Sequence, residues 1–186
     1  MKYAEPITET GDAADRRSGG HHRIAIIGAG FAGLGMAIRC QQAGIRDWIL
    51  LEAADDVGGT WRDNTYPNCQ CDVPSNLYSF SFALKPDWSR SFGWAEEIHD
   101  YLRECTDEFG LRDRIRFGSR VTCAEWDSEA DHWELRCADG WSGTADVVIS
   151  GQGPLSAPSI PDIPGLAEFT GPVFHSAEWD HDVDLA

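Results

Sequence analysis

Long apolar runs are missing from this sequence: no segment approaches the roughly 18 to 20 consecutive apolar residues that a membrane-spanning helix needs. The N-terminal residues 1–22 are polar and contain no hydrophobic segment of the kind that a signal peptide carries. They also lack periodicity, so we predict a disordered leader there. Together these absences predict a protein that has no membrane span and stays in the cytoplasm.

Basic residues are scarce, since 15 Lys and Arg stand against 31 Asp and Glu and give a formal net charge of −16. A surface this negative repels phosphate backbones and anionic lipid headgroups. We therefore expect neither a nucleic-acid partner nor a membrane partner.

The cysteines contain no C-x-x-C pair, which is the usual local sign of a metal or redox site. In a reducing compartment they are expected to be free thiols, and a metal site or a disulfide framework is the less favoured alternative. We therefore predict no metal site. The six cysteines are Cys40, Cys69, Cys71, Cys105, Cys123 and Cys137.

The first regular pattern in the sequence is that of a βαβ unit. With 186 residues and 42% apolar side chains, the chain is long enough for one well-buried domain. A short β-branched run at 23–27 leads into a glycine-rich turn and a helix-compatible segment that stops at Gly44. The run "WILLEA" at 48–53 follows as a second buried strand. This order predicts an α/β domain with a parallel sheet.

The rest of the chain alternates between irregular and regular segments. A long stretch at 53–94 is rich in glycine, proline and aromatic residues, which argues for a loop that wraps a ligand. Apolar residues recur at helical spacing over 95–109, which predicts an amphipathic helix. Strand-like alternation at 115–127, 132–140 and 145–153 predicts a small antiparallel meander with a hairpin turn at Asp139-Gly140, and the four prolines of 154–165 predict an extended connector.

A dinucleotide fingerprint, G-x-G-x-x-G, follows the first predicted strand at Gly28, Gly30 and Gly33, with Phe31 inside it. The three glycines suit a tight turn, a close backbone approach to a pyrophosphate and close helix-to-strand packing. Glu52 ends the second predicted strand, where a carboxylate accepts hydrogen bonds from ribose hydroxyls and repels a 2′-phosphate. The pattern favours FAD or NAD over NADP; the alternative is a structural turn that binds nothing.

The segment "GGTWRDNTYPNCQCDVPSNLYSFSF" resembles class B flavoprotein monooxygenases, in particular Baeyer–Villiger monooxygenases. The resemblance implies an FAD site lined by Gly59, Thr60, Trp61 and Tyr78. It also implies that Asp72 lies close to the reactive face of the flavin as a catalytic residue. The alternative is a loop acid that caps backbone amides. A catalytic thiol at Cys69 or Cys71 is disfavoured, because no base is nearby in the sequence.

Two later segments extend the resemblance. The strand pair around Val121 is similar to the family's meander, which implies that Val121 meets the adenine through backbone groups. "SGQGPL" stands where the family has A-T-G closing over FAD, so Gly151 and Gln152 replace the usual Ala and Thr while Gly153 keeps the close backbone approach.

The end of the sequence carries F-x-G-x-x-x-H-x-x-x-W-[P/D], the signature of Baeyer–Villiger monooxygenases. In the family this segment links the FAD domain to an NADPH domain, and its histidine couples domain movement to the cofactor. The resemblance therefore implies a hinge role for His175; the alternative is a histidine that packs at a domain edge. The matching residues are Phe169, Gly171, His175, Trp179 and Asp180.

The resulting expectation is a Rossmann-like FAD-binding domain at 23–153 and a signature linker at 154–186, truncated before the NADPH-binding domain. The implied activity is an FAD- and NADPH-dependent monooxygenase that inserts one oxygen atom of O2 into a ketone. The alternatives are a catalytically inactive FAD-binding remnant and an N- or S-oxygenating flavin-containing monooxygenase. A truncated domain would also expose sheet edges and apolar surface, so self-association is expected.

Overall fold

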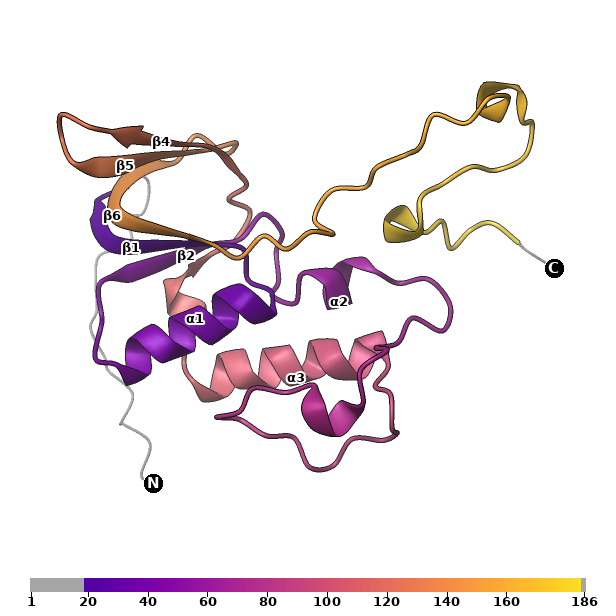
Figure 1. The fold of residues 1–186 in the computed structure, drawn as a ribbon, viewed down its shortest axis with the longest axis horizontal. Coiled ribbons are helices and arrows are strands. Elements are labelled where there is room, and N and C mark those ends of the chain that lie inside the picture. Colours follow the sequence, from indigo (N-terminus) through magenta and orange to yellow (C-terminus); the bar gives the residue numbers. More distant parts are fainter. Residues whose placement is uncertain (1–18, 185–186) are drawn as a thin grey trace.

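The computed structural model describes residues 19–184. In this range one six-stranded sheet has the order β3-β2-β1-β6-β5-β4 (Figure 1). The neighbours of β1, which are β2 and β6, run parallel to it, and β3 runs parallel to β2, whereas β4, β5 and β6 form an antiparallel meander. The predicted parallel sheet with a small meander is therefore confirmed. The strands are β1 (His21–Ile27), β2 (Trp48–Leu51), β3 (Ile115–Arg116), β4 (Val121–Asp127), β5 (His132–Cys137) and β6 (Ser142–Ser150).

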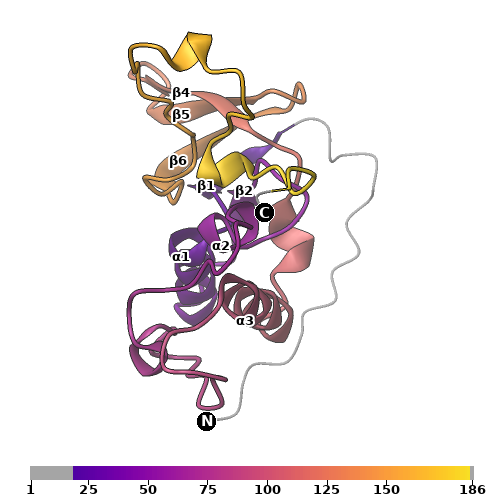
Figure 2. The ribbon, with the colours of Figure 1, turned by 90° about the vertical axis from the view of Figure 1, so that its right-hand side faces the viewer.

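Helices cover one face of the parallel part of the sheet, as the two views show (Figures 1 and 2). The helices are α1 (Phe31–Gln42), the single turn α2 (Thr60–Asp63) and α3 (Ala95–Glu108). The amphipathic helix predicted at 95–109 is thus confirmed. Short 3-10 turns occupy Ser75–Leu77, Arg112–Arg114, Leu166–Glu168 and Ser176–Glu178.

Two apolar clusters hold the layers together. Ile24 and Ile26 of β1 pack with Leu34 and Ile38 of α1 and with Leu102 of α3 on the helical side. A second cluster lies where the meander joins the parallel strands and includes Ala25, Leu135, Trp141 and Ala145. Among the described residues, no helix is both long and apolar enough to cross a membrane.

The first strand begins at His21, two residues before the predicted start. His21 pairs with Thr144 and His22 with Ala145 of β6. The His21 ring also lies 3.0 Å from the Thr144 hydroxyl and 2.9 Å from an Asp146 carboxylate oxygen. These contacts order the end of the predicted leader, of which residues 1–18 lie outside the described range.

The strand predicted at 115–127 is two strands in the structure. Ile115 and Arg116 pair with β2, and Gly118 then adopts a φ of +64° and turns the chain toward the meander. The hairpin turn at Asp139-Gly140 is confirmed: Gly140 has a φ of +87°, and an Asp139 carboxylate oxygen accepts a hydrogen bond from the Trp141 amide at 3.1 Å.

Candidate functional site

The site forms where three parallel strands end at the same level. Ile27 of β1 is in register with Leu51 of β2 and with Ser150 of β6. The segments that follow these strands therefore leave the sheet side by side, at the carboxyl edge where ligands of open α/β sheets bind. Two hydrogen bonds fix them, from the Gly28 amide to the Leu51 carbonyl at 2.8 Å and from the Gly151 amide to the Ile27 carbonyl at 2.7 Å.

Two glycines of the fingerprint are required by the protein itself. Gly28 has a φ of +93°, and a Cβ there would lie 2.9 Å from the Gly151 carbonyl oxygen. A Cβ on Gly33 would lie 1.8 Å from the Gly28 carbonyl oxygen, so this glycine lets α1 pack against the turn. Both positions therefore serve the close packing that the fingerprint predicts.

Gly30 differs from the other two. It has an extended backbone, with φ −85° and ψ −167°, which any residue adopts. A Cβ there would meet only the Gly59 Cα, at an ordinary 3.8 Å. Nothing in residues 19–184 requires a glycine at this position, whereas a ligand lying close to the backbone would.

The same turn presents backbone donors. Gly30 is the N-cap of α1, with no side-chain cap hydrogen bond and no acidic residue in the first helical turn. The first N–H groups of a helix have no intrahelical partners, and the helix dipole adds partial positive charge there. The turn is therefore suited to an anionic group such as a pyrophosphate.

Glu52 directly follows β2 and is buried, with 4% of its surface exposed. One carboxylate oxygen accepts a hydrogen bond from the Ala29 amide at 2.6 Å. The other accepts from the Ala54 amide at 2.9 Å and from Arg62 at 3.1 Å. A carboxylate has about four acceptor positions, so one is left for a ligand hydroxyl.

Aromatic side chains form the opposite wall of the site. The Tyr78 ring lies edge-on to Phe31 at 4.9 Å and to Trp61 at 5.5 Å. The Trp61 indole donates a hydrogen bond to the Tyr78 hydroxyl at 3.1 Å. Burial raises the pKa of Tyr78, and the charges of Cys71 and Asp72 raise it further against the opposing Trp61 hydrogen bond. The hydroxyl therefore keeps its proton and stays a donor at neutral pH.

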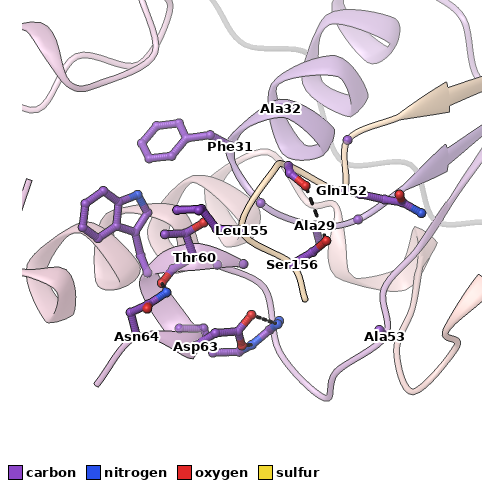
Figure 3. A pocket seen from close by; sticks show the side chains of 18 of the residues that line it. Ala29, Phe31, Ala32, Ala53, Thr60, Asp63, Asn64, Gln152, Leu155 and Ser156 are labelled. Atoms are coloured by element: carbon purple, nitrogen blue, oxygen red, sulfur yellow. Dashed lines mark hydrogen bonds and ion pairs between the residues drawn. The ribbon is translucent and has the colours of Figure 1, made fainter. Parts of the chain in front are cut away.

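These parts enclose a cavity of about 710 Å³, within the roughly 300 to 1,000 Å³ typical of ligand sites (Figure 3). Anion-binding amides, a buried acid and an apolar aromatic wall match the pyrophosphate, ribose and isoalloxazine of FAD in chemical type. The residues present therefore fit this cofactor. The predicted site residues that line the cavity are Gly28, Gly30, Phe31, Glu52, Gly59, Thr60, Trp61, Asp72, Tyr78, Val121 and Gly153.

Two predicted residues lie outside the cavity lining. Gly33 packs beneath the turn, as described above. His175 caps the short turn at Ser176–Glu178, because its Nδ1 accepts a hydrogen bond from the Ala177 amide at 3.1 Å. Asp72 is exposed at the cavity, and none of the described residues makes a hydrogen bond or ion pair with it, so the amide-capping alternative has no partner in this range.

The sequence analysis missed several lining residues, among them Arg62, Arg120 and the connector residues Leu155 and Ser156. It also missed a contact from the signature segment to the loop. The Thr65 hydroxyl lies 2.9 Å from the His181 ring, and the Tyr66 and Trp179 rings are 6.4 Å apart. A single sequence carries no local signal for such pairs, because their partners are far apart along the chain.

Two further groups of side chains can be reactive, namely the cysteines and one set of potential metal ligands. All six cysteines are free thiols, and Cys69 and Cys71, which line the cavity, are both buried. The described residues include one group with the spacing to hold a metal ion, formed by Asp127, His132 and Glu134 of the β4–β5 hairpin. It lies outside the cavity lining, and the sequence analysis did not predict it.

Residues 26–95 match the family model described as an NAD(P)-binding Rossmann-like domain. A Baeyer-Villiger monooxygenase of Streptomyces coelicolor is 57% identical over 89% of this chain and 32% of its own length. Another of Pseudomonas aeruginosa is 47% identical over 89% of this chain and 31% of its own length. A solved structure of OTEMO in complex with FAD and NADP is 37% identical, with a TM-score of 0.78, over 87% of this chain and 31% of that chain.

The chain thus spans about a third of the length of the curated relatives that it matches. The match includes the glycine turn, the loop at 53–94 and the meander, all within one shared arrangement of strands and helices. By sequence and by fold, the chain is similar to a Rossmann-like part of proteins named Baeyer-Villiger monooxygenase.

Proposed function

We propose that this chain provides the FAD site of a monooxygenase that uses NADPH and O2 to insert one oxygen atom beside a ketone carbonyl. Support for the FAD site comes above all from Gly30, where a Cβ would meet only the Gly59 Cα at 3.8 Å among the described residues, which leaves room for a ligand close to the backbone. Support for the reaction comes from the relatives named Baeyer-Villiger monooxygenase and from the signature at Phe169–Asp180. The six free thiols suit a reducing cytoplasm, which the proposal includes.

The residues of this chain act by binding and positioning. The turn at Gly28–Gly33 and the start of α1 hold the pyrophosphate, and Glu52 accepts a hydrogen bond from a ribose hydroxyl. Trp61 and Tyr78 form an apolar wall that keeps water from the isoalloxazine, and Asp72 places a carboxylate at the cavity. FAD, when bound, supplies the capacity to take electrons from a nicotinamide and to react with O2.

FAD binding is tested by adding FAD to the desalted chain and recording the absorbance and fluorescence of the flavin. We expect saturable binding, which Gly30→Ala weakens at least about tenfold, or about 1.4 kcal/mol, because its Cβ enters the space of the ligand. Gly20→Ala is the matched control, because a Cβ at Gly20 meets nothing within 4 Å and lies outside the cavity lining. Absence of binding in the unaltered chain would refute the proposed site.

A second measurement distinguishes the proposed monooxygenase from the alternative, which is an FAD-binding remnant without turnover. NADPH oxidation by the flavin-loaded chain, followed with and without a ketone, reports on the complete reaction. Binding of FAD without NADPH oxidation would assign this chain the cofactor site alone. Oxygenation of an amine or sulfide in preference to a ketone would favour the N- or S-oxygenating alternative.

Self-association is a further part of the proposal, because the connector and signature segment expose large apolar side chains. Leu155, Ile160 and Phe169 are 61%, 62% and 60% exposed. Apolar surface gathered on one segment favours association. We expect sedimentation velocity to show species larger than a monomer at micromolar concentration, and a monodisperse monomer would contradict this part.

A further inference from the structure

His99 is a buried histidine of α3 to which the proposed reaction assigns no role. Only 9% of its surface is exposed. Its Nε2 lies 2.8 Å from the Val57 carbonyl oxygen, in the loop between β2 and α2. A carbonyl only accepts, so the ring donates from Nε2 and is held in that tautomer.

The His99 ring packs directly against Gly58, the first residue of the glycine pair Gly58–Gly59 in the cavity wall. Gly58 has a φ of +122°, and a Cβ on Gly58 would lie 2.5 Å from the His99 Cδ2. The Gly58 amide donates a hydrogen bond to the Ala29 carbonyl at 2.9 Å. A Cβ on Gly59 would lie 3.3 Å from the Gly30 Cα, so the glycine pair lies close against the fingerprint turn. The ring therefore supports the wall from the side away from the cavity.

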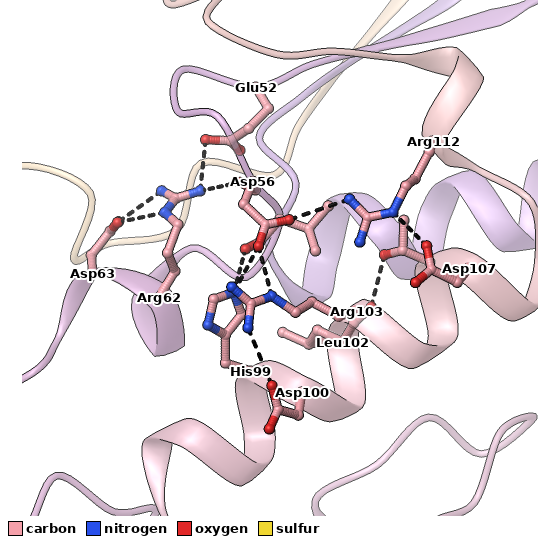
Figure 4. Close-up of polar contacts among 12 residues, drawn as sticks. Glu52, Asp56, Arg62, Asp63, His99, Asp100, Leu102, Arg103, Asp107 and Arg112 are labelled. Atoms are coloured by element: carbon pink, nitrogen blue, oxygen red, sulfur yellow. Dashed lines mark hydrogen bonds and ion pairs between the residues drawn. The ribbon is translucent and has the colours of Figure 1, made fainter.

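Asp56, just before Val57, anchors the same loop to α3 (Figure 4). Its carboxylate accepts hydrogen bonds from Arg103 at 2.7 Å and from Arg112 at 3.4 Å. Its carbonyl accepts from Arg62 at 2.5 Å. Burial acts to raise the pKa of Asp56, but the hydrogen bonds, first of all from Arg103, outweigh it and lower that pKa. Asp56 therefore stays ionised and holds the loop at one point, and His99 holds it at the next.

We propose that His99 is a positioning residue of the FAD site, which keeps Val57, Gly58 and Gly59 against the fingerprint turn through its hydrogen bond and its ring. The expected effect of His99 on FAD binding rests on the proposed function. The contact itself is a property of the chain without cofactor. His99 touches the cavity wall and not the cavity, since it is absent from the lining residues.

The protonation state of His99 gives the stability of the fold a pH dependence. Burial lowers the pKa of His99 from its ordinary 6.5, and Arg103 lowers it further, against the Val57 hydrogen bond and the charges of Asp56 and Asp100. The neutral ring is thus favoured in the folded chain. The stability that the neutral ring contributes to the fold is complete above pH 6.5 and is lost as the pH falls toward the lowered value. The groups that face the ring are Asp56, the Val57 carbonyl, Gly58 and Arg62 from the loop, and Asp100 and Arg103 from α3.

The test compares two variants of His99 with one control. His99→Gln keeps an amide donor for the Val57 carbonyl, whereas His99→Leu keeps an apolar volume and removes the donor. Thr106→Val is the control, because Thr106 is fully buried on the same helix and its hydroxyl donates within that helix, to the Leu102 carbonyl at 2.7 Å. Amide hydrogen exchange at Gly58 and Gly59 is measured without FAD, FAD affinity is measured at neutral pH, and the free energy of unfolding in urea is measured from pH 5 to 8.

We expect His99→Leu to speed exchange at Gly58 and Gly59 and to weaken FAD binding, each by about tenfold, as for one lost buried hydrogen bond. Thr106→Val should leave both near the unaltered values, and His99→Gln, which keeps the donor and loses the ring, should fall between the unaltered chain and His99→Leu. Below pH 6.5 the free energy of unfolding of the unaltered chain should fall by a step that His99→Gln lacks, because the buried ring must then carry a charge. If His99→Leu does not fold, the pH-dependent step and the hydrogen exchange of His99→Gln decide whether His99 holds the wall.

The inference is overturned if His99→Leu leaves exchange and affinity unchanged, or if Thr106→Val changes them as much. It is also overturned if the pH step persists in His99→Gln. If the unaltered chain binds no FAD, the proposed function fails, but the exchange at Gly58 and Gly59 still decides whether His99 holds the wall.

Discussion

Gly33→Ala is expected to destabilise the chain by more than about 4 kcal/mol, a loss that is exceptional for a single substitution. Gly33 lies in the first turn of α1, where helix propensity alone would make alanine more stable by about 1 kcal/mol. The contact reverses this sign, because the added Cβ would lie 1.8 Å from the Gly28 carbonyl oxygen. The atom that the Cβ would meet belongs to the backbone and not to a flexible side chain, so either α1 or the turn must move.

Urea unfolding of Gly33→Ala, followed by far-UV circular dichroism, measures this loss. Gly30→Ala is the matched control, because it lies three residues earlier in the same motif and makes no contact shorter than 3.8 Å. We expect that control to lose less than about 1 kcal/mol, as for a weak N-cap. Equal unfolding midpoints for the two variants would contradict the division of roles between packing and ligand approach.

The parts of the fold that were predictable are those that a local pattern specifies. Helix 95–109 was predictable because Ile98, Tyr101 and Leu102 recur on one face, and all three are buried in the structure. The glycine turn was predictable because a strand, a turn, a helix, a second strand and a terminal acid follow one another there as in a βαβ unit. The Asp139-Gly140 turn was predictable because glycine readily adopts the positive φ that such a hairpin turn needs, and Gly140 has one in the structure.

The parts that were not predictable depend on partners distant in the chain. Two polar histidines do not resemble a strand, yet His21 extends β1 because Thr144 and Asp146 offer it hydrogen bonds. The sequence does not distinguish Arg62 from the other arginines, and only the fold places it beside Glu52, which directly follows β2. His99 and Gly58 stand 41 positions apart, and only the packing of α3 beneath the loop brings them together. A single sequence contains the residues of these pairs but not their pairing.

Glu52→Ala is expected to cost about 3 to 5 kcal/mol of stability and to abolish FAD binding, because it removes one partner of a buried ion pair. The side chains of Arg62 and Glu52 are 17% and 6% exposed and lie 3.1 Å apart. The substitution would also leave the Ala29 and Ala54 amides without their carboxylate acceptor. Arg62 keeps Asp63 and the Asp56 carbonyl, so its own charge is not stranded and the lower end of the range applies.

Glu52→Gln and a double-mutant cycle with Arg62→Met separate these causes. Glutamine keeps one acceptor oxygen for a backbone amide and loses the charge, so we expect a loss between those of the unaltered chain and Glu52→Ala. If the ion pair dominates, Arg62→Met should add little to Glu52→Ala; if the amides dominate, the two losses should add. Full stability with unaltered FAD affinity in Glu52→Ala would show that the acid serves neither the turn nor the ribose, because both uses require the same carboxylate.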